Sequence, residues 1–502
     1  MNATLQRFRR DAILRATLLS GSFIAAGTAL GFLRDLTMAH LFGASGDTDA
    51  FLVAWTIPET VSPLLIEDAM ALLMVPAVTR AVAEHGSVRP LIRATLPRLS
   101  ASLVAVMLAT AWLAPQIAEL LAPGLPQHDL ATTCMRYTSA AVACFGLAGY
   151  MSATLRAHED YGPPSRIYLA YNIGILAAIA TLHSTLGVVA AALGVAIGGL
   201  LMVGVQLPSF LRRVRVPAVT RGAVTSLTLL SVVPIVAYTL SRQAQVFVER
   251  FFGSSLAAGS LSHLNYAQKI AQVPMVASLL IVTVTFPKLA RSSVDGDHDG
   301  VRRRVEADLL LVGALVLSAI AFLVALAPTA VELLFEHGRF SGRDTAATAL
   351  CLRVYSLGLL GQAMIGVLAR AFFADGARHW KPAAGTGCGL IATAVVAALT
   401  VGPYGAIGLA LANAVGISVA AGLLFWFLRS SIRVSAQRVL PRLAGLILTA
   451  AGASAAGYFV SHLLPPSAPA LLVLVVGAAA VAAVFGSVTT IAGLHKTALA
   501  RA

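Results

Sequence analysis

The sequence predicts an all-α integral membrane protein with about 14 transmembrane helices, and three observations support this fold class. Hydrophobic residues make up 58% of the 502-residue chain and charged residues only 12%, whereas soluble domains carry about 25% charge. The mean hydropathy is +0.83. Long apolar runs recur along the whole chain, and basic residues gather in alternate connections between them.

The apolar runs define the expected helices, because a hydrocarbon core of about 30 Å needs about 20 apolar residues per span. Fourteen such runs are present, at residues 16–38, 50–79, 99–121, 132–155, 167–182, 184–206, 223–248, 262–286, 305–333, 345–369, 382–401, 404–428, 443–462 and 468–493. The run at 50–79 is too long and too polar for one regular span, since it contains Pro58, Pro63 and Glu67. We therefore expect a bent helix there, with its polar residues facing protein or water.

The basic residues predict the orientation. With the N-terminus inside, the cytoplasmic connections hold 28 of the 36 Lys and Arg residues and the outer connections hold 4. This asymmetry follows the positive-inside rule and places both termini in the cytoplasm. The net charge of +14 therefore reflects membrane topology, and no nucleic-acid partner is expected.

Two shorter features are consistent with this organisation. The basic, apolar N-terminus could pass for a signal peptide, but its apolar run continues to Arg34, so we expect it to be retained. Four cysteines (Cys134, Cys144, Cys351 and Cys388) lack metal-ligand spacing. They are expected to be small buried hydrophobic residues without disulfides.

An internal repeat divides the chain. The stretch "ATTCMRYTSAAVACFGLAGYMSATLRAHED" resembles "ATALCLRVYSLGLLGQAMIGVLARAFFADG", and "LFGAS" at 41–45 resembles "FFGSS" at 251–255. Both members of each pair fall on the same predicted side of the membrane, which indicates a parallel repeat. We expect an N-lobe at 1–222, a C-lobe at 223–430 and an appended helix pair at 431–502. Transporters built from such repeats bind substrate between the lobes and alternate its exposure. A chance similarity of Ala/Leu-rich helices is the alternative.

Polar side chains form stripes on several predicted spans, and buried ionisable residues usually face a cavity or a partner. The eighth span carries Asn265, Gln268, Lys269 and Gln272 on one face, and the seventh carries Arg242, Gln245 and Glu249. The first two spans carry Thr28, Gly31, Arg34, Asp35, Glu59, Ser62 and Glu67. One interpretation is that acids and bases only pair to hold helices together, for example Asp35 or Glu59 with Arg34. The other is a cavity lined by Arg and Lys, which suits an anion, because Arg binds phosphate oxygens bidentately.

Other classes of function fit the sequence less well. There is no P-loop, no His-rich metal cluster and no Ser-His-Asp arrangement, so an enzyme is not expected and no cofactor is predicted. A cation-coupled drug antiporter would place acids deep in the cavity, whereas this chain places bases there. A polyprenyl-linked glycosyltransferase would need a larger extramembrane loop. A scaffold role for an inactive paralogue is a further alternative.

Three segments resemble the MurJ/MviN family of the MOP exporter superfamily, the flippases for lipid II, which is the undecaprenyl-pyrophosphate-linked peptidoglycan precursor. They are "LGFLRDLTMAHLFGASGDTDAFLVAWTIPE", "FFGSSLAAGSLSHLNYAQKIAQVPMVASLLIVTVTFPKLAR" and "LLFEHGRFSGRDTAATALCLRVYSLGLLGQ". The resemblance covers nearly the whole chain and implies fourteen helices. It also implies a bacterial inner-membrane location, a role in cell-wall synthesis, and a lipid-linked glycan as substrate within the bilayer.

The resemblance carries over to individual residues. Arg34 and Asp35 match an Arg-Asp pair of the family's first helix, Asp49 matches the aspartate of its Thr-Asp-Ala-Phe, and Glu67 matches a glutamate of its second helix. Lys269 stands where the family has an arginine. Other positions depart: Gly27-Thr28 replaces a Ser-Arg, Ser62 and Pro63 replace paired arginines, and Gln272 replaces a glutamate. Arg242 appears where the family tends to be uncharged.

The complete predicted substrate-binding set is Arg34, Asp35, Asp49, Glu59, Glu67, Arg242, Glu249, Asn265, Lys269, Gln272 and Arg353. We expect the pyrophosphate to enter from the cytoplasmic side and to settle near Arg34, Arg242 and Lys269. The membrane potential or a monovalent cation could drive the cycle. The depleted arginine set keeps open an alternative substrate, another polyprenyl-linked glycan such as an exopolysaccharide or O-antigen unit.

Overall fold

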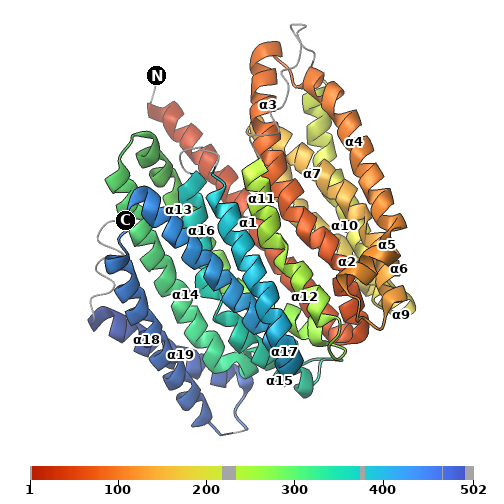
Figure 1. The fold of residues 1–502 in the computed structure, drawn as a ribbon. Coiled ribbons are helices and arrows are strands. Elements are labelled where there is room, and N and C mark those ends of the chain that lie inside the picture. Colours follow the sequence, from red (N-terminus) through yellow and green to blue (C-terminus); the bar gives the residue numbers. More distant parts are fainter. Residues whose placement is uncertain (1–2, 217–232, 374–378, 466, 492–502) are drawn as a thin grey trace. The chain divides into compact units, whose positions relative to one another are not determined.

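The protein is helical throughout the part that the computed structural model describes, which comprises residues 3–216, 233–373, 379–465 and 467–491 (Figure 1). No strand occurs in these ranges. Nine of their helices are long and apolar enough to cross a membrane, or ten if one bent pair, Gly342–Ser356 with Leu359–Phe373, is one span. The chain is therefore an all-α, multi-pass membrane protein, as its sequence predicts.

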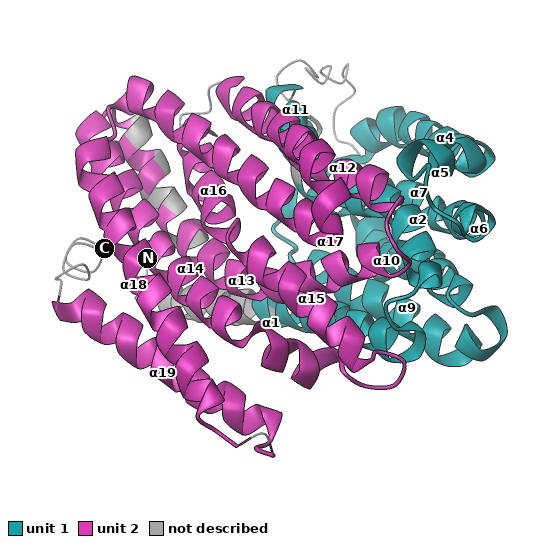
Figure 2. Cartoon of the chain, turned by 60° about the horizontal axis from the view of Figure 1, so that its bottom comes forward, with its two compact units in different colours: residues 1–240 teal, residues 241–502 magenta. Residues whose placement is uncertain are grey.

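The chain forms two compact units, residues 1–240 and 241–502 (Figure 2). The predicted lobe boundary at 222/223 lies outside the described residues. Unit 1 begins with α1 (Ala3–Phe42), α2 (Gly46–Ser62), a π-helical turn η1 (Pro63–Asp68) and α3 (Ala69–His85). It continues through α4 (Arg89–Trp112), α5 (Ala114–Leu121), α6 (His128–Thr138), α7 (Ala140–Ala157), α8 (Gly162–Ser165), α9 (Ile167–Leu186), α10 (Val189–Val214) and most of α11 (Val233–Gln243).

Unit 2 contains the remaining helices. These are α12 (Gln245–Gly253), α13 (Ser260–Val294), α14 (His298–Phe335), α15 (Gly342–Ser356), α16 (Leu359–Phe373), α17 (Lys381–Ile432), α18 (Ala436–His462) and α19 (Ala470–Ile491). The C-terminal pair α18 and α19 packs on α14. Glu306 of α14 secures this pair by accepting a hydrogen bond of 2.8 Å from the backbone N–H of Ser435, just before α18.

The described parts of the predicted runs coincide with these helices. Part of the run 223–248 and the last two residues of the run 468–493 lie outside the described residues. Two boundaries differ. The run 184–206 is predicted to start too early, because α9 continues to Leu186. The runs 382–401 and 404–428 lie in the single 52-residue α17, broken at Gly405. A straight helix of that length would measure roughly 78 Å, so α17 is long enough for two crossings.

A glycine lies at each of these two boundaries, where the chain turns from one helix into the next. Gly187 has φ 56° and ψ −137°, and Gly405 has φ 55° and ψ −132°. Such dihedrals are open to glycine and strained for other residues. The same backbone conformation thus reverses the chain at corresponding places in the two units, which supports the internal repeat.

A second pair of breaks corresponds as well. Leu113 separates α4 from α5, and Leu326 has non-helical dihedrals inside α14. Ala-Pro follows in both cases, at 114–115 and 327–328. Proline lacks the N–H that would continue the helical hydrogen bonds, so the same dipeptide explains both breaks.

The irregular second span is explained by η1. Residues 63–68 form a π-helical turn between α2 and α3, where the sequence predicts a bent helix. Gly149 of α7 packs directly against the carbonyl oxygen of Leu65, leaving no room for a Cβ atom. The π-turn is therefore held by close packing of α7.

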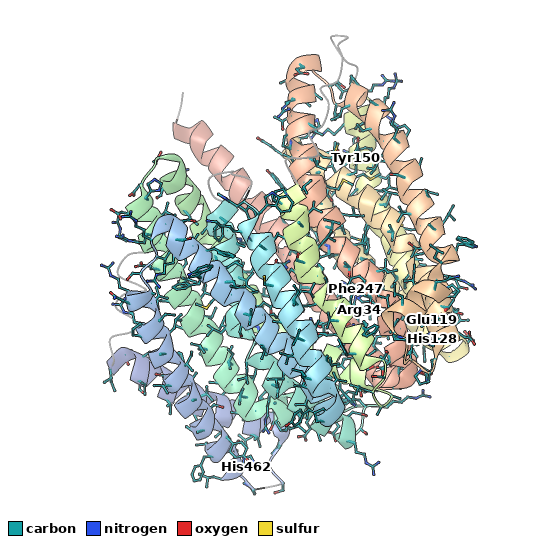
Figure 3. The ribbon with its side chains drawn as sticks, in the orientation of Figure 1. Arg34, Glu119, His128, Tyr150, Phe247 and His462 are labelled. Atoms are coloured by element: carbon teal, nitrogen blue, oxygen red, sulfur yellow. The ribbon has the colours of Figure 1, made fainter. Side chains whose placement is uncertain are left out.

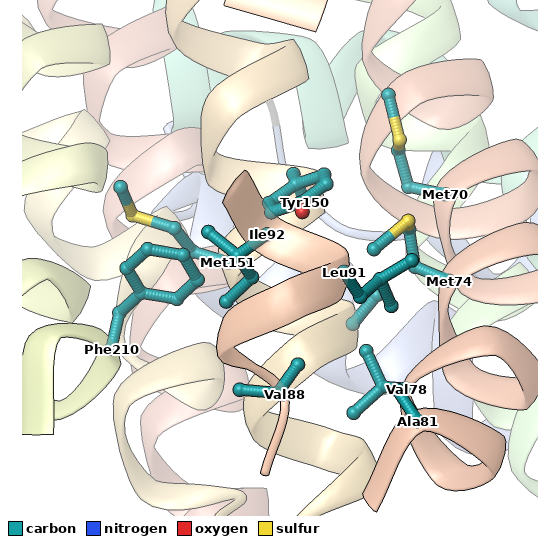
Figure 4. Close-up of a cluster of buried hydrophobic side chains, with 11 residues drawn as sticks. Met70, Met74, Val78, Ala81, Val88, Leu91, Ile92, Tyr150, Met151 and Phe210 are labelled. Carbon is teal, nitrogen blue, oxygen red and sulfur yellow. The ribbon is translucent and has the colours of Figure 1, made fainter. Parts of the chain in front are cut away.

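A core of buried side chains lies beside this turn in unit 1 (Figure 4). It is formed mainly by Met70, Met74, Val78, Leu91, Ile92, Tyr150, Met151 and Phe210. Tyr150 and Phe210 meet edge to face with ring centroids 6.2 Å apart, and the Tyr150 hydroxyl hydrogen-bonds Thr95 at 2.7 Å. The core fixes α3, α4, α7 and α10 to one another.

Two expectations about buried residues need correction. Cys388 is exposed, unlike the other three cysteines, because apolar side chains of a membrane protein can also face lipid. Arg250 is one of the four basic residues that the sequence assigns to the outer connections, together with Arg136, Arg339 and Arg343. The structure places it inside α12, where it is only 2% exposed.

Candidate functional site

The candidate site of unit 1 is built around Arg34 of α1 (labelled in Figure 3). Its Nε and Nη2 atoms donate to Oδ1 of Asp35 at 3.0 and 2.8 Å. The side chains of this pair are 12% and 10% exposed. The acid–base pairing that the sequence left open is therefore present. Because Asp35 accepts on one side of the guanidinium, the Nη1 edge faces other groups.

Asn172 of α9 meets that edge. Its Oδ1 atom accepts from Arg34 Nη1 at 3.4 Å, a long hydrogen bond. Its Nδ2 atom donates to the backbone carbonyl oxygens of Gly27 and Tyr168, each at 3.0 Å. A Cβ atom on Gly27 would lie only 3.0 Å from Tyr168 Cβ. The missing side chain at Gly27 thus lets α1 approach α9 closely enough for Asn172 to orient Arg34.

Aromatic rings cover the other side of the guanidinium. Arg34 Cζ lies 4.9 Å from the ring centroid of Trp55 on α2, within the range of a cation–π interaction. Trp55 packs against Phe51 and Tyr171, with centroids 5.7 and 6.2 Å apart. Tyr171 also meets Phe145 edge to face at 5.4 Å. We call Arg34, Asp35, Trp55, Tyr171 and Asn172 the Arg34 cluster.

The three predicted acids of α2 and η1 occupy different environments. Asp49 lies in the first turn of α2 and is buried, and Glu59 is half-buried. Glu67 is exposed on η1 and accepts a hydrogen bond of 2.8 Å from the Tyr168 hydroxyl. Glu67 therefore links the π-turn to α9. Its partner Tyr168 lies one helical turn before Tyr171 of the Arg34 cluster.

Unit 2 has its own polar cluster, with an acid at its centre. Glu249 of α12 is 4% exposed and accepts a 2.5 Å hydrogen bond from Nδ2 of Asn413 on α17. One turn earlier, Gln245 donates to the Thr393 hydroxyl at 3.2 Å. Both contacts join α12 to α17. We call these four residues the Glu249 cluster.

The other predicted residues of this unit are spread over α11 and α13. Arg242 is exposed, Asn265 is buried, and Lys269 and Gln272 are half-buried. The i, i+4, i+7 spacing of the last three on α13 places them on one face, as predicted.

Arg353 has a contact that explains its position without a ligand. Its Nε atom donates to the backbone carbonyl oxygen of Val324 at 3.0 Å. Val324 is four residues before Pro328, so its carbonyl has no helical N–H partner. Arg353 supplies that hydrogen bond and thereby ties α15 to the break in α14.

The described part of the chain has no visible basis for a metal site. It contains no group of three or more His, Cys, Asp or Glu residues that could hold a metal ion. The Arg34 cluster combines an ion pair with an amide and aromatic rings, and the Glu249 cluster combines one carboxylate with amide and hydroxyl groups.

The model of one protein family, described as "Lipid II flippase MurJ", matches residues 38–476. The chain belongs to this family. Its MurJ relatives include the lipid II flippase of Burkholderia cenocepacia, 26% identical over 435 residues, which are 83% of this chain and 84% of that protein. The probable lipid II flippase of Rhizobium meliloti is 28% identical over 382 residues, 68% of this chain and 67% of that protein. Members of the MurJ family are transporters, so the chain is a membrane transporter and not an enzyme.

Solved structures agree on the fold. A lipid II flippase MurJ in an inward closed conformation superimposes with a TM-score of 0.77 at 18% identity, covering 94% of this chain and 98% of the other. An inward-facing multidrug resistance MATE transporter of the MOP superfamily reaches 0.65 at 15% identity, covering 84% and 99%. At these identities the matches establish the shared MurJ and MATE fold.

Three residues of α9 contact the candidate site although the sequence did not single them out. Tyr168, Tyr171 and Asn172 are spaced i, i+3 and i+4, so they share the face that meets α1 and α2. The signal was present in the sequence, because "YLAYN" interrupts an otherwise apolar run. It was overlooked because none of these side chains carries a formal charge.

Proposed function

We propose that the chain moves lipid II from the cytoplasmic to the periplasmic leaflet of the bacterial inner membrane by alternating access, with both termini in the cytoplasm. The observation that carries this proposal is the Arg34 cluster, a guanidinium held deep in an apolar bundle of a lipid II flippase family member. A positive group in such a place is costly unless it is paired. Asp35 offsets that cost, and a phosphate could take over the same role.

The hydrogen bonds of Arg34 have a geometry that suits replacement of a protein acceptor by a substrate oxygen. Asp35 uses a single oxygen, Oδ1, for both of its short hydrogen bonds to Arg34, and the bond to Asn172 is long at 3.4 Å. A pyrophosphate presents several oxygens and can engage the guanidinium bidentately. We propose that Asp35 keeps Arg34 oriented until the substrate arrives, and that the pyrophosphate then replaces part of this pairing.

The remaining predicted residues keep proposed supporting roles. Within unit 2, Arg242 and Lys269 would supply positive charge, and Asn265 and Gln272 would supply neutral donors on the face of Lys269. Asp49, Glu59, Glu67 and Glu249 would balance charge around the substrate path. For Arg353 we propose a structural role, because Val324 already accepts its hydrogen bond.

Membrane potential would favour the transport direction. An inside-negative potential contributes about 2.3 kcal/mol per charge per 100 mV to outward movement of an anion, and roughly twice that for a dianion. We therefore propose coupling to the potential or to a monovalent cation, without a cofactor.

The test uses a bacterial strain whose own lipid II flippase can be depleted. The wild-type chain should restore growth and prevent accumulation of lipid II, measured by mass spectrometry of extracted lipids. Arg34→Ala should lose both effects at equal expression. The matched control is Arg166→Ala, since Arg166 also joins α9 to α1 by lying 5.7 Å from the Phe23 ring centroid but is outside the Arg34 cluster. Full growth with Arg34→Ala would remove Arg34 from the site.

A second candidate substrate is another polyprenyl-linked glycan. It is favoured by Ser62 and Pro63, which stand where the family has paired arginines, so part of the expected recognition of lipid II is missing. The same lipid extraction separates the two. If wild-type chain fails to clear lipid II but clears an exopolysaccharide or O-antigen intermediate, the alternative replaces the first proposal.

A further inference from the structure

The hydroxyl group of Tyr171 differs from the hydroxyl groups of Tyr150 and Tyr168 in the same unit. Tyr171 is 5% exposed, and its Oη atom is buried without a hydrogen-bond partner among the described residues. Two other tyrosines of the same unit do have partners. The Tyr150 hydroxyl meets Thr95 at 2.7 Å, and the Tyr168 hydroxyl donates to Glu67 at 2.8 Å. A buried donor without an acceptor costs free energy, so a group retained in this state calls for an explanation.

The ring that carries this hydroxyl is fixed in place. Phe145 meets it edge to face at 5.4 Å, and Trp55 packs on it at 6.2 Å. Trp55 also contacts the Arg34 guanidinium, and the next residue along the chain, Asn172, hydrogen-bonds it. The hydroxyl and the guanidinium interact electrostatically as well. Tyr171 therefore belongs to the same cluster as Arg34.

Donors outnumber acceptors in this cluster. Arginine has five N–H donors and no acceptor, and the phenol adds an O–H donor. Against these stand the Asp35 carboxylate, whose Oδ1 already accepts twice, and Oδ1 of Asn172. The Glu59 carboxylate is a further electrostatic neighbour of both Arg34 and Tyr171. The Tyr171 hydroxyl still lacks an acceptor, and an incoming group with several oxygens and negative charge can accept from both the hydroxyl and Arg34. A phosphate group has this chemistry, whereas a hydroxyl or a sugar ring has no charge to match Arg34.

We infer that Tyr171 donates a hydrogen bond to a phosphate oxygen of the polyprenyl-linked substrate and acts with Arg34 as a specificity-determining residue for pyrophosphate. This rests on the proposed function, because it assigns a further residue to the same site. It concerns the phosphate and is independent of the attached glycan.

The hydrogen bond also gives the substrate an influence on conformation. A ligand shifts a conformational equilibrium only if its interaction differs between the states. In the conformation described, the Tyr171 hydroxyl is covered, so the substrate reaches it only when the surrounding helices rearrange. A hydrogen bond made after that rearrangement stabilises the rearranged state specifically.

The experiment compares Tyr171→Phe with Tyr150→Phe in the purified full-length protein. Each variant removes one hydroxyl and keeps the ring, and Tyr150 lies in the core shown in Figure 4, outside the Arg34 cluster. Binding of undecaprenyl pyrophosphate and of the neutral alcohol undecaprenol is measured by native mass spectrometry. Thermal unfolding of both variants is measured in the same detergent.

The two variants should show opposite results. Tyr171→Phe should weaken undecaprenyl pyrophosphate binding about tenfold, as expected for a hydrogen bond to a charged group. It should leave undecaprenol binding and the unfolding temperature unchanged or higher. Tyr150→Phe should lower the unfolding temperature and leave both affinities unchanged. If Tyr171→Phe binds undecaprenyl pyrophosphate as the wild type does, or loses both ligands equally, the inference is overturned.

The proposed function can fail separately. If the wild-type chain shows the Tyr171-dependent affinity but does not clear lipid II in the depleted strain, the inference stands and the substrate assignment fails. If Tyr171→Phe has unchanged affinity while the wild type clears lipid II, the proposed function stands and the inference fails.

Discussion

The polar clusters of the two units have charged groups of opposite sign at their centres. In unit 1 the central group is a base, Arg34, neutralised by the adjacent acid Asp35 and oriented by Asn172. In unit 2 it is an acid, Glu249, which accepts from Asn413. In the register that aligns 41–45 with 251–255, Asp35 corresponds to Gln245. The acid of unit 1 is thus a neutral amide in unit 2.

This difference indicates how a repeat can diverge. In each unit a helix ahead of the repeated motif contacts a long helix near the end of the repeat through an asparagine. The asparagines lie on opposite sides of the glycine turns, Asn172 before Gly187 and Asn413 after Gly405. The charged groups that they contact have opposite signs. Since an isolated buried charge is costly in either case, each substitution required a suitable partner. Unit 1 thereby has the chemistry for an anion.

The largest effect is expected from breaking the pair in unit 1. Asp35→Leu leaves Arg34 without its carboxylate and should lower the free energy of unfolding by about 3 kcal/mol. The thermal unfolding of the purified protein measures this. The double variant Arg34→Leu/Asp35→Leu should recover most of that stability, because no charge then remains, while transport stays lost. An equally unstable double variant would show that the two side chains act separately.

In unit 2 a smaller loss is expected. Asn413→Leu removes a hydrogen bond to a buried carboxylate, which contributes about 2 kcal/mol. In the Glu249→Gln background the same change should cost about half as much, because the acceptor is neutral. Chemical unfolding curves of the four proteins give this coupling. Equal losses in both backgrounds would show that the charge of Glu249 does not strengthen its bond to Asn413.

The two Ala-Pro breaks offer a further comparison. Arg353→Leu should cost about 1.5 kcal/mol by leaving the Val324 carbonyl without a donor. Pro328→Ala restores an N–H four residues after Val324, so it should reduce that cost. Arg136, the counterpart of Arg353 in the repeat, is exposed, and Arg136→Leu should change stability little. An undiminished cost of Arg353→Leu in the Pro328→Ala background would contradict the assigned contact.

The smallest effects are expected at the glycine turns. A Cβ atom on Gly187 meets nothing within 4 Å, so Gly187→Ala tests backbone strain alone. It and Gly405→Ala should each cost about 1 kcal/mol. Gly402→Ala is the control, because this helical glycine also has open space around its Cβ position and alanine favours helix. Unfolding temperatures of the three variants should separate the turns from the control.

The helices could be predicted from the sequence because their signals are local. Apolar runs of membrane-spanning length specify the spans, and Arg34, Asp35 and Lys269 are conspicuous as charges within them. The early start predicted for 184–206 has a simple cause. Residues on both sides of Gly187 are equally apolar, so composition does not reveal a turn that depends on one φ angle.

The tertiary structure decided which of the charged residues work together. Arg34 and Asn172 are 138 positions apart, and Glu249 and Asn413 are 164 apart, so no local pattern connects them. Arg353, which the sequence predicts as a substrate-binding residue, donates to the Val324 carbonyl because α15 packs on α14. The hydrophobicity and charge of a segment depend on that segment alone, so they can be determined from the sequence. Hydrogen-bond partners depend on which helices meet, and only the folded chain determines that.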